Sequence, residues 1–257
     1  MSEPTPSPVS SPPPSAIRCE ALHARAEFEE AVLLQKRIWG FDDVESLPVR
    51  LFVVATKIGG QVFGAYDGGR MIGFCIAIPG LKSGGVNYLH SHMLGVLPEY
   101  NNLGIGRRLK LLQREDAVAR GIELMEWTFD PLELKNAYFN MERLGAIVRR
   151  YVENQYGTTT SHLHGGLPTD RCVAEWWMAT ERVRRVVAGE EPARTVEARV
   201  EVPADIATMR HQDPKRAREI QKRIGEQLQE YFGRGLAVVG FERTEEKGTY
   251  LLGPWQR

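Results

Sequence analysis

The sequence has few cysteines, no long hydrophobic run and no excess of either charge. Its three cysteines, Cys19, Cys75 and Cys172, are odd in number and lack a CxxC spacing, which argues against a disulfide framework or a zinc ribbon. The longest apolar stretch, Met71 to Ile78, is far shorter than the roughly 20 residues that a membrane-spanning helix needs. Lysine plus arginine equals aspartate plus glutamate at 33 each, so no global field attracts polyanions.

These absences favour a cytoplasmic protein that binds neither nucleic acid nor membrane. Cys75 lies in an apolar, strand-like run, where a buried and inert thiol is the expected outcome. Residues 1–15 are rich in proline and serine, with no basic start and no apolar run. They predict a disordered tail rather than an export signal.

What is present is typical of an ordinary globular protein. Hydrophobic residues make up 42% and charged residues 26% of the 257 positions. This length allows one domain with an appendage or two small domains.

Hydrophobic periodicity and glycine positions predict alternating strands and helices up to about residue 179. The predicted strands are 16–22, 61–66, 70–78, 88–96, 122–129, 146–151 and 172–179. The predicted helices are 27–39, 49–58, 104–119 and 134–144. Asp67-Gly68-Gly69 between two of the strands is a hairpin turn signal.

Beyond a predicted linker at 189–194 the pattern changes. Asp213-Pro214 predicts a helix start, and Gly233 predicts its end. Its apolar stripe is Ala217, Ile220, Ile224, Leu228 and Phe232. Two short strands, 236–241 and 249–252, predict a final hairpin. We therefore divide the chain into a tail at 1–15, a main domain at 16–184 and a linker with a helix–hairpin extension at 185–257.

The segment from Leu94 to Arg108 predicts an anion-binding loop, because a strand runs through glycines directly into a helix. The first amides of a helix lack internal partners and carry the positive end of the helix dipole, so they can bind a pyrophosphate. A side chain at Gly104 or Gly106 would hold phosphate oxygens away from these donors. Arg107 and Arg108 can add charge-assisted contacts.

Two glycines at this spacing also fit an ordinary, tightly packed strand-to-helix turn. A dinucleotide-binding loop would require a third glycine where Leu109 stands. A phosphate-binding P-loop would require Gly-Lys followed by Ser or Thr, which is absent.

The stretch from His90 to Gly121 resembles the acyl-CoA-binding motif of the GNAT superfamily of N-acetyltransferases. That motif has Gln or Arg, two variable residues, Gly, a variable residue and Gly or Ala, after a strand that ends in an apolar-x-Val-x-Pro run. Here the motif is Asn101-Asn102-Leu103-Gly104-Ile105-Gly106, with Val96 and Pro98 before it. The order of elements from Ile17 to Ala179 also resembles this fold, and more narrowly an uncharacterised bacterial branch of it.

Two positions depart from the family pattern. Asn101 stands where the family has Gln or Arg, which shortens one expected pyrophosphate contact. Gly145-Ala146 replaces a Gly-Phe pair, and Met141 stands where many members have the Tyr that protonates the departing thiolate.

The resemblance implies an α/β (α+β) fold, with a mixed central sheet whose middle strands splay, flanked by helices. It implies acetyl-CoA or another acyl-CoA as co-substrate, no metal, and a small-molecule amine or amino acid as acceptor. It further implies direct attack by the amine in a ternary complex. The implied cofactor-binding residues are Leu94, Gly95, Val96, Asn101, Asn102, Leu103, Gly104, Ile105, Gly106, Arg107 and Asn136.

The chemistry requires a group that removes a proton from the amine, and His92 is the first candidate because its ordinary pKa of about 6.5 suits this task. A structural histidine fits His92 equally well. Glu126 and Asp130 are further candidates on the neighbouring strand, with solvated carboxylates as the simpler interpretation. Tyr138 is the candidate acid in place of the missing Tyr, with a packed aromatic as the simpler interpretation.

Two other hypotheses stay open. One is a non-catalytic acyl-CoA-binding module with a role in assembly, which the departures at Asn101 and Met141 favour. The other is a metal-dependent hydrolase, based only on the pairs His90/His92 and His162/His164. The stripe of the C-terminal helix must be buried, either over the acceptor site or in a possible homodimer.

Overall fold

The computed structural model describes residues 17–157 and 167–256. These residues form two compact units, which we describe separately. Unit 1 contains the residues up to Ala77 together with Met93–Gln113, and unit 2 contains Ile78–His92 together with the chain from Arg114 onward. The predicted tail at 1–15 lies outside the described residues.

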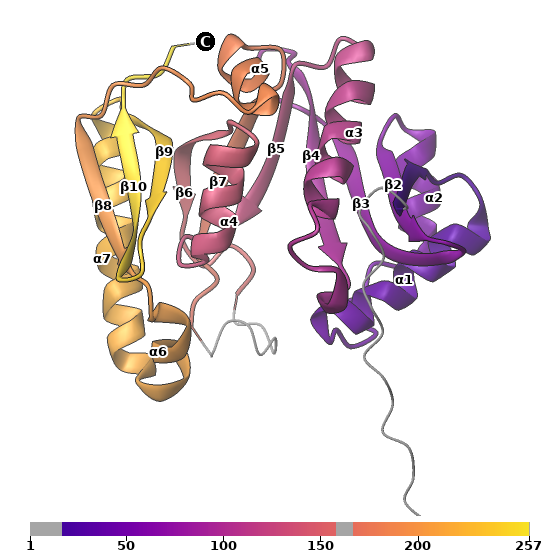
Figure 1. Ribbon diagram of the computed structural model, residues 1–257, viewed down its shortest axis with the longest axis horizontal. Coiled ribbons are helices and arrows are strands. Elements are labelled where there is room, and N and C mark those ends of the chain that lie inside the picture. The colour runs from indigo at the N-terminus through magenta and orange to yellow at the C-terminus, as the bar shows by residue number, and fades with distance from the viewer. Residues whose placement is uncertain (1–16, 158–166, 257) are drawn as a thin grey trace, which may run out of the picture. The chain divides into compact units, whose positions relative to one another are not determined.

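Unit 1 combines antiparallel strands with helices (Figure 1). Its elements are β1 (Ile17–Ala21), α1 (Arg25–Trp39), α2 (Val49–Lys57), β2 (Gln61–Asp67), the first part of β3 (Arg70–Leu81), the last part of β4 (Asn87–Val96), η2 (Pro98–Tyr100) and the first part of α3 (Ile105–Ala119). β2 pairs antiparallel with both β1 and β3. The predicted hairpin is confirmed, since Asp67 pairs with Arg70 around Gly68, whose φ is 58°.

The core of unit 1 is built from the apolar faces of these elements. Phe28 on α1, Phe52 on α2 and Phe74 on β3 are fully buried. The ring of Phe52 contacts both of the other two rings. Ile105 and Leu109 on α3 are buried as their helical spacing predicts. Each large side chain buried in this way contributes about 1.5–3 kcal/mol. This core holds α3 and the loop before it in place.

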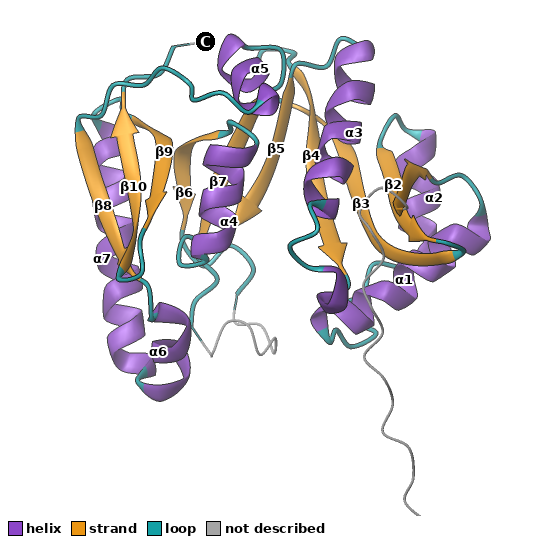
Figure 2. Ribbon diagram, viewed as in Figure 1, coloured by secondary structure: helices purple, strands orange, loops and turns teal. Residues whose placement is uncertain are grey.

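Unit 2 holds a seven-stranded, mostly antiparallel sheet with the order β4-β5-β7-β6-β9-β10-β8. Among the described strand pairs of this sheet, only that of β4 with β5 is parallel. The strands beyond β4 are β5 (Leu124–Phe129), β6 (Ile147–Val152), β7 (Arg171–Trp177), β8 (Ala198–Pro203), β9 (Ala237–Arg243) and β10 (Lys247–Gly253). The helices are α4 (Leu134–Tyr138), η3 (Phe139–Arg143), α5 (Glu181–Ala188), α6 (Ile206–Gln212) and α7 (Pro214–Gly233) (Figure 2).

The C-terminal part of the chain is built into the sheet of unit 2. β9 bonds to β6 through Val148 and Val238, and α7 packs on β6 and β8. Four residues of the apolar stripe of α7 are therefore buried within the chain itself, Ala217, Ile220, Ile224 and Leu228, while Phe232 is partly exposed. In the predicted linker, Arg194 forms a 2.7 Å ion pair with Glu142 of η3.

Most predicted elements are confirmed within a few residues. The predicted helix at 134–144 is confirmed as two consecutive segments, a five-residue α4 that passes into the π-helical η3. The sequence analysis missed α5, β8 and α6. The division into 16–184 and 185–257 stays a prediction. None of the helices in the described residues combines the length and hydrophobicity needed to cross a membrane.

Candidate functional site

The loop before α3 has an unusual backbone that turns the chain sharply into the helix. Pro98–Tyr100 forms a single 3-10 turn, after which Asn102 and Gly104 adopt positive φ angles of 65° and 75°. Alternation of ordinary and left-handed residues curls successive amides toward a common point, which is the geometry of an anion-binding nest. Hydrogen bonding inside α3 begins with the amide of Arg108 donating to the carbonyl of Gly104 at 3.0 Å.

The space next to Gly104 and Gly106 is open. A Cβ built on Gly104 meets nothing within 4 Å, and one built on Gly106 meets only Leu94, at 3.4 Å. Packed side chains therefore do not block the turn, and diphosphate oxygens could approach the helix start. The interpretation of Gly104 and Gly106 as part of an anion-binding loop requires this open space. Gly95 has a different reason, because a Cβ there would collide with the ring of Trp39.

Side chains from the β2–β3 hairpin hold the loop. The hydroxyl of Tyr100 donates to Asp67 at 2.6 Å, and Arg70 forms a 2.9 Å ion pair with Glu99. The hydrogen bond to Asp67 raises the pKa of Tyr100, so the hydroxyl keeps its proton and its donor role. The loop is thus fixed before a ligand arrives, which lowers the entropy that binding must remove.

The remaining predicted cofactor residues fall into two groups. Asn101 and Asn102 are exposed, and Leu103, Gly106 and Arg107 are partly exposed. Ile105 is buried in the core of unit 1, and Leu94 and Val96 are partly buried against it. Arg108 donates to the carbonyl of Ile17 at 2.5 Å, so its guanidinium also serves the fold.

The sequence contains no sign of a buried lysine in α3. Lys110 on α3 is only 3% exposed, and burial lowers its pKa to about 7. The neighbouring Cys75 is fully buried, and burial raises the pKa of its thiol to about 12. The prediction of a buried Cys75 is confirmed, and the raised pKa agrees with an inert thiol.

Unit 2 carries a row of titratable side chains on one face of its sheet. His90 pairs with Glu126 across the parallel β4–β5 ladder, and Glu126 pairs with Glu175 across β5 and β7. Paired residues of neighbouring strands point to the same face. The predicted alternation of His90 and His92 onto one face is supported by their ring centroids, which lie 5.9 Å apart.

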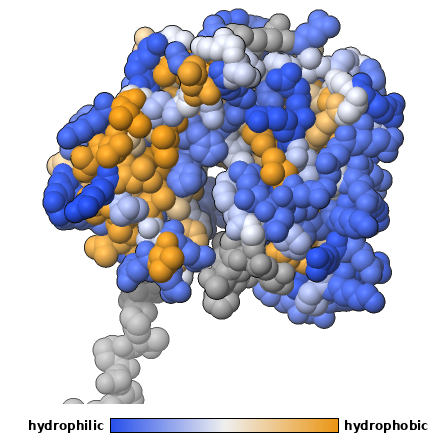
Figure 3. Space-filling model, turned by 180° about the vertical axis from the view of Figure 1, so that it is seen from behind, coloured by the Kyte–Doolittle hydropathy of each residue, from blue (hydrophilic) through white to orange (hydrophobic). Residues whose placement is uncertain are grey.

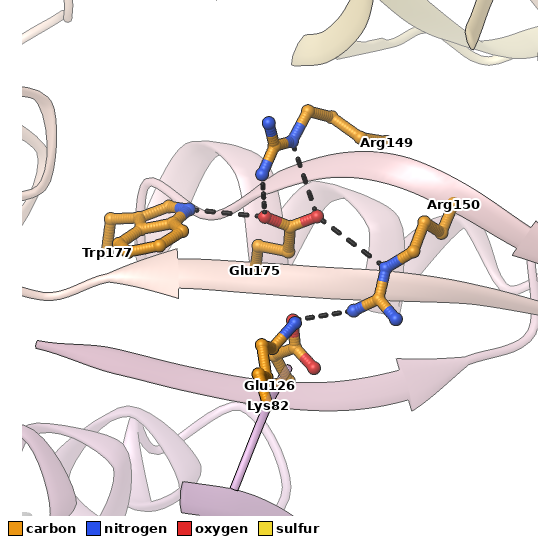
Figure 4. Close-up of polar contacts among 6 residues, drawn as sticks. All are labelled: Lys82, Glu126, Arg149, Arg150, Glu175 and Trp177. Atoms are coloured by element: carbon orange, nitrogen blue, oxygen red, sulfur yellow. Dashed lines mark hydrogen bonds and ion pairs between the residues drawn. The ribbon is translucent and has the colours of Figure 1, made fainter. Parts of the chain in front are cut away.

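Cations surround the two glutamates of this row (Figure 4). Glu126 is ion-paired with Lys82 and, at 2.6 Å, with Arg150. Glu175 accepts from Arg149 at 2.6 Å and from the indole of Trp177 at 3.2 Å. We call Lys82, Glu126, Arg149, Arg150 and Glu175 the charged cluster.

A β-bulge explains how two consecutive arginines reach the same face. Val148 pairs with Ala174 and Arg150 pairs with Val173, so Arg149 is an extra residue in β6. In a regular strand, neighbours point to opposite faces, whereas a bulge lets both turn the same way. The sequence predicts both arginines in a regular strand at 146–151, and no sequence signal indicates this bulge.

His92 is exposed on β4, although neighbouring protein atoms partly desolvate its imidazole. This desolvation lowers its pKa below the ordinary 6.5, since it disfavours the charged imidazolium. A neutral imidazole near neutral pH can accept a proton from an amine.

The simpler interpretation of Glu126 and Asp130 as solvated carboxylates is wrong, because they are only 4% and 8% exposed. Asp130 forms a 2.7 Å ion pair with the buried Arg210 of α6 and accepts from the amide of Leu132 at 2.8 Å. These partners come from the C-terminal part of the chain and from the loop after β5. Asp130 is thereby committed to the fold of unit 2.

Asn136 and Tyr138 are exposed on α4, and Tyr138 is 40% exposed beside Arg243 and Glu245. The interpretation of Tyr138 as a packed aromatic is therefore wrong. Trp127 reaches Asn140 of η3 at 3.2 Å, so α4 and η3 cover the face opposite Glu126.

The structure accordingly does not bring Tyr138 together with Glu126. Met141 is fully buried and presents no polar hydrogen. His162 and His164 lie outside the described residues.

The sequence profile of the Acetyltransferase (GNAT) family matches residues 29–145, which include the loop and the start of α3. Residues 29–145 form a GNAT acetyltransferase domain. The GNAT match supports the expected enzyme class, an acyl-CoA-dependent N-acetyltransferase. Among proteins with curated descriptions, none matches this sequence.

Solved GNAT structures share the fold at low sequence identity. Arabidopsis thaliana NAA60 in complex with a bisubstrate analogue is 14% identical, with 63% of this chain and 97% of that chain covered and a TM-score of 0.51. Aminoglycoside 6'-acetyltransferase type Ii is 17% identical, with 64% and 99% covered and a TM-score of 0.50. A GNAT acetyltransferase from Streptococcus pneumoniae is 14% identical, with 62% and 98% covered and a TM-score of 0.50. The predicted mixed α/β GNAT fold is confirmed.

Proposed function

We propose that this protein transfers an acetyl group, or another acyl group, from acyl-CoA to the amine of a small molecule or an amino acid. The observation that carries the proposal is the loop at Asn101–Arg107. Its positive-φ residues, the open space at Gly104 and the helix start fit a pyrophosphate. The family of residues 29–145 supplies the reaction class.

In the proposed ternary complex the amine nitrogen attacks the thioester carbonyl carbon directly. A C–N bond forms, the C–S bond breaks, and the sulfur leaves as a thiolate that takes up a proton. The backbone at Leu94 and Val96 would hold the acyl-CoA, and the first amides of α3 would hold its diphosphate. Correct placement of the two reactants accounts for a large part of such rate enhancements.

We assign His92 as the group that accepts the proton of the amine, because it is exposed and its pKa is lowered by desolvation. Glu126 is a weaker candidate, since two cations already bind its carboxylate. We assign it the role of holding Arg150 and Lys82. Tyr138 stays the candidate acid because its side chain is exposed, and Asn136 stays a candidate contact to the pantetheine arm.

The direct test is Gly106→Asp, a change that should harm binding more than folding. An aspartate in the first turn of a helix interacts favourably with the helix dipole, so α3 should still form. Its charge and bulk would repel a diphosphate from the same amides. We expect at least about tenfold weaker acetyl-CoA binding by calorimetry, with an unchanged circular dichroism spectrum.

A matched control is Ala207→Asp, which adds one negative charge to the exposed first turn of α6. Acetyl-CoA binding should be unaffected there. Thiol release from acetyl-CoA, measured with a panel of amines, then tests turnover. Unchanged acetyl-CoA affinity in Gly106→Asp would falsify the assignment of the loop.

A second candidate is a non-catalytic acyl-CoA-binding module with a role in assembly. The fully buried Met141 favours it, because this position offers no hydroxyl to the departing thiolate. Tight acetyl-CoA binding without thiol release on any amine of the panel would support this candidate over the enzyme.

A homodimer is a further proposal, supported by exposed apolar side chains of unit 1. Leu33 on α1, Val54 on α2 and Ile58 after it are 62%, 46% and 53% exposed. The face that includes α1 and α2 shows a hydrophobic area (Figure 3). Such areas commonly mark protein contacts. Light scattering of wild type and of Leu33→Lys/Ile58→Lys would reveal whether a dimer forms and whether this surface makes it.

A further inference from the structure

We propose that the guanidinium groups of Arg149 and Arg150 bind a carboxylate of the acceptor, so that the acceptor is an amino acid or a similar carboxylate-bearing amine. This inference rests on the proposed acyl transfer and names its substrate class. All residues that carry it belong to unit 2.

In the charged cluster the arginines are exposed to solvent and the carboxylates are buried. It contains three cations and two carboxylates, which leaves a net charge of +1. The carboxylates of Glu126 and Glu175 are buried, with side chains 6% and 3% exposed. Arg149 and Arg150 are 43% and 48% exposed. A ligand that approaches from solvent therefore meets positive charge first.

The second argument is the supply of hydrogen-bond donors. A guanidinium has five N–H donors, and the contacts with Glu126 and Glu175 occupy only part of them. Two guanidiniums side by side can form the forked contacts that arginine makes with carboxylates. A bound carboxylate would bring the cluster to three cations and three anions, which removes its net charge.

The third argument is rigidity. The ion pairs with buried Glu175 and Glu126 fix the guanidiniums of Arg149 and Arg150. The bulge at Arg149 directs both arginines to one face. Arg149 also lies over the ring of Trp255, with its guanidinium carbon 4.9 Å from the ring centroid. Arginines held in this way lose less entropy when they bind an anion.

The charged cluster lies beside β4, the strand that carries the proposed base His92. Glu126 is in register with His90 on the next strand, and the strand spacing is about 4.8 Å. Arg150 reaches Glu126 at 2.6 Å, so its guanidinium lies over β5, beside the strand that carries His90 and His92. An amino group near His92 and a carboxylate on Arg150 can therefore belong to one small molecule.

The surroundings of Arg149 suit an apolar substituent on that molecule. Trp177 and Trp255 stack with ring centroids 5.9 Å apart and lie on the buried side chains of Ile147 and Val239. Both tryptophans remain partly exposed. Phenylalanine, whose ring could lie against these indoles, is therefore a suitable probe.

The experiment compares phenylalanine, phenylalaninamide and phenethylamine as acceptors of the full-length protein with acetyl-CoA. Rates are expressed per concentration of unprotonated amine, which corrects for the different ionisation of the three amines. We expect kcat/KM for phenylalanine to exceed that of the other two by about tenfold or more, since charge-assisted contacts carry this preference. Arg150→Gln and Arg149→Gln should raise KM for phenylalanine by a similar factor and leave the two carboxylate-free amines unchanged.

Two controls separate recognition from stability. Arg199→Gln removes a comparable exposed arginine of β8 that is paired with Glu242 at 2.7 Å, and it should change nothing. Arg149→Gln/Glu175→Gln removes both partners of one pair, so no buried carboxylate is left without its arginine. This double variant should still show the raised KM for phenylalanine.

Binding of phenylalanine in the presence of CoA, measured by ligand-observed NMR, provides a readout that needs no turnover. If no amine is acetylated, the proposed function fails, while phenylalanine binding that is lost in Arg150→Gln still supports the carboxylate site. Equal use of all three acceptors, absence of phenylalanine binding, or a parallel loss of CoA affinity in the arginine variants would overturn the inference.

Discussion

The hydroxyl of Tyr100 donates a 2.6 Å hydrogen bond to the carboxylate of Asp67, which ties the loop before α3 to the turn of the β2–β3 hairpin. Tyr100 is only 9% exposed, and its amide is bonded to the carbonyl of Leu97. The shape of the proposed diphosphate site therefore depends on Tyr100, which is not among the proposed binding residues.

Tyr100→Phe removes only this hydroxyl, and we expect it to destabilise the protein by about 1 kcal/mol. Because the loop would then be less well fixed, acetyl-CoA should bind about two- to tenfold more weakly. Thermal unfolding and calorimetric titration measure the two effects. Tyr231→Phe on α7 serves as the control, and an equal loss of affinity there would contradict this role of Tyr100.

Gly104 and Gly106 should respond in opposite ways to alanine. Gly104 has a φ of 75°, so Gly104→Ala should cost about 1–2 kcal/mol of stability even though space is open around it. Gly106 lies inside α3, where Gly106→Ala should stabilise by up to about 1 kcal/mol.

Both alanine variants should nevertheless weaken acetyl-CoA binding, because each added methyl group would occupy open space beside the proposed diphosphate site. Denaturant unfolding and calorimetry on the same preparations separate the two effects. A Gly106→Ala protein with higher stability and full affinity would show that a ligand does not approach this turn.

The sequence predicted the elements whose signals are local. The spacing of Ile105 and Leu109 gave α3, and Asp67 with Gly68 gave the hairpin turn, because helical periodicity and turn chemistry act over a few residues. The motif at Gly104 and Gly106 was found for the same reason.

The sequence did not predict contacts that join distant segments. The simpler interpretation of Glu126 is a solvated carboxylate, whereas its partners are Lys82, which follows β3, and Arg150 on β6. The bulge that turns Arg149 and Arg150 to one face depends on pairing with β7 and leaves no mark in a single sequence.

The pH dependence of His92 has a definite sign. Desolvation lowers its pKa in the folded protein below the ordinary 6.5, so the native state binds its proton more weakly than the unfolded state. The contribution of neutral His92 to the free energy of unfolding is therefore complete above about pH 6.5. It is lost as the pH falls from there through the pKa of His92 in the folded protein.

If His92 is the base, kcat/KM should fall on the acidic side with an apparent pKa below 6.5, once the ionisation of the amine is taken into account. His92→Gln should lower kcat by about 10²–10⁴-fold and abolish this acidic limb. His90→Gln is the neighbouring control on β4. An unchanged pH profile in His92→Gln would exclude His92 as the base.

The ion pair between Arg210 and Asp130 should contribute far more to folding than the exposed pairs of the same unit. The side chain of Arg210 is 3% exposed and that of Asp130 9%, so Arg210→Met leaves a buried carboxylate without its guanidinium. We expect a loss of about 3–5 kcal/mol in the free energy of unfolding. Arg199→Met breaks a pair in which both side chains are 51% exposed, and it should cost less than about 1 kcal/mol. Urea unfolding of both variants decides the comparison, and equal losses would show that α6 does not stabilise the end of β5.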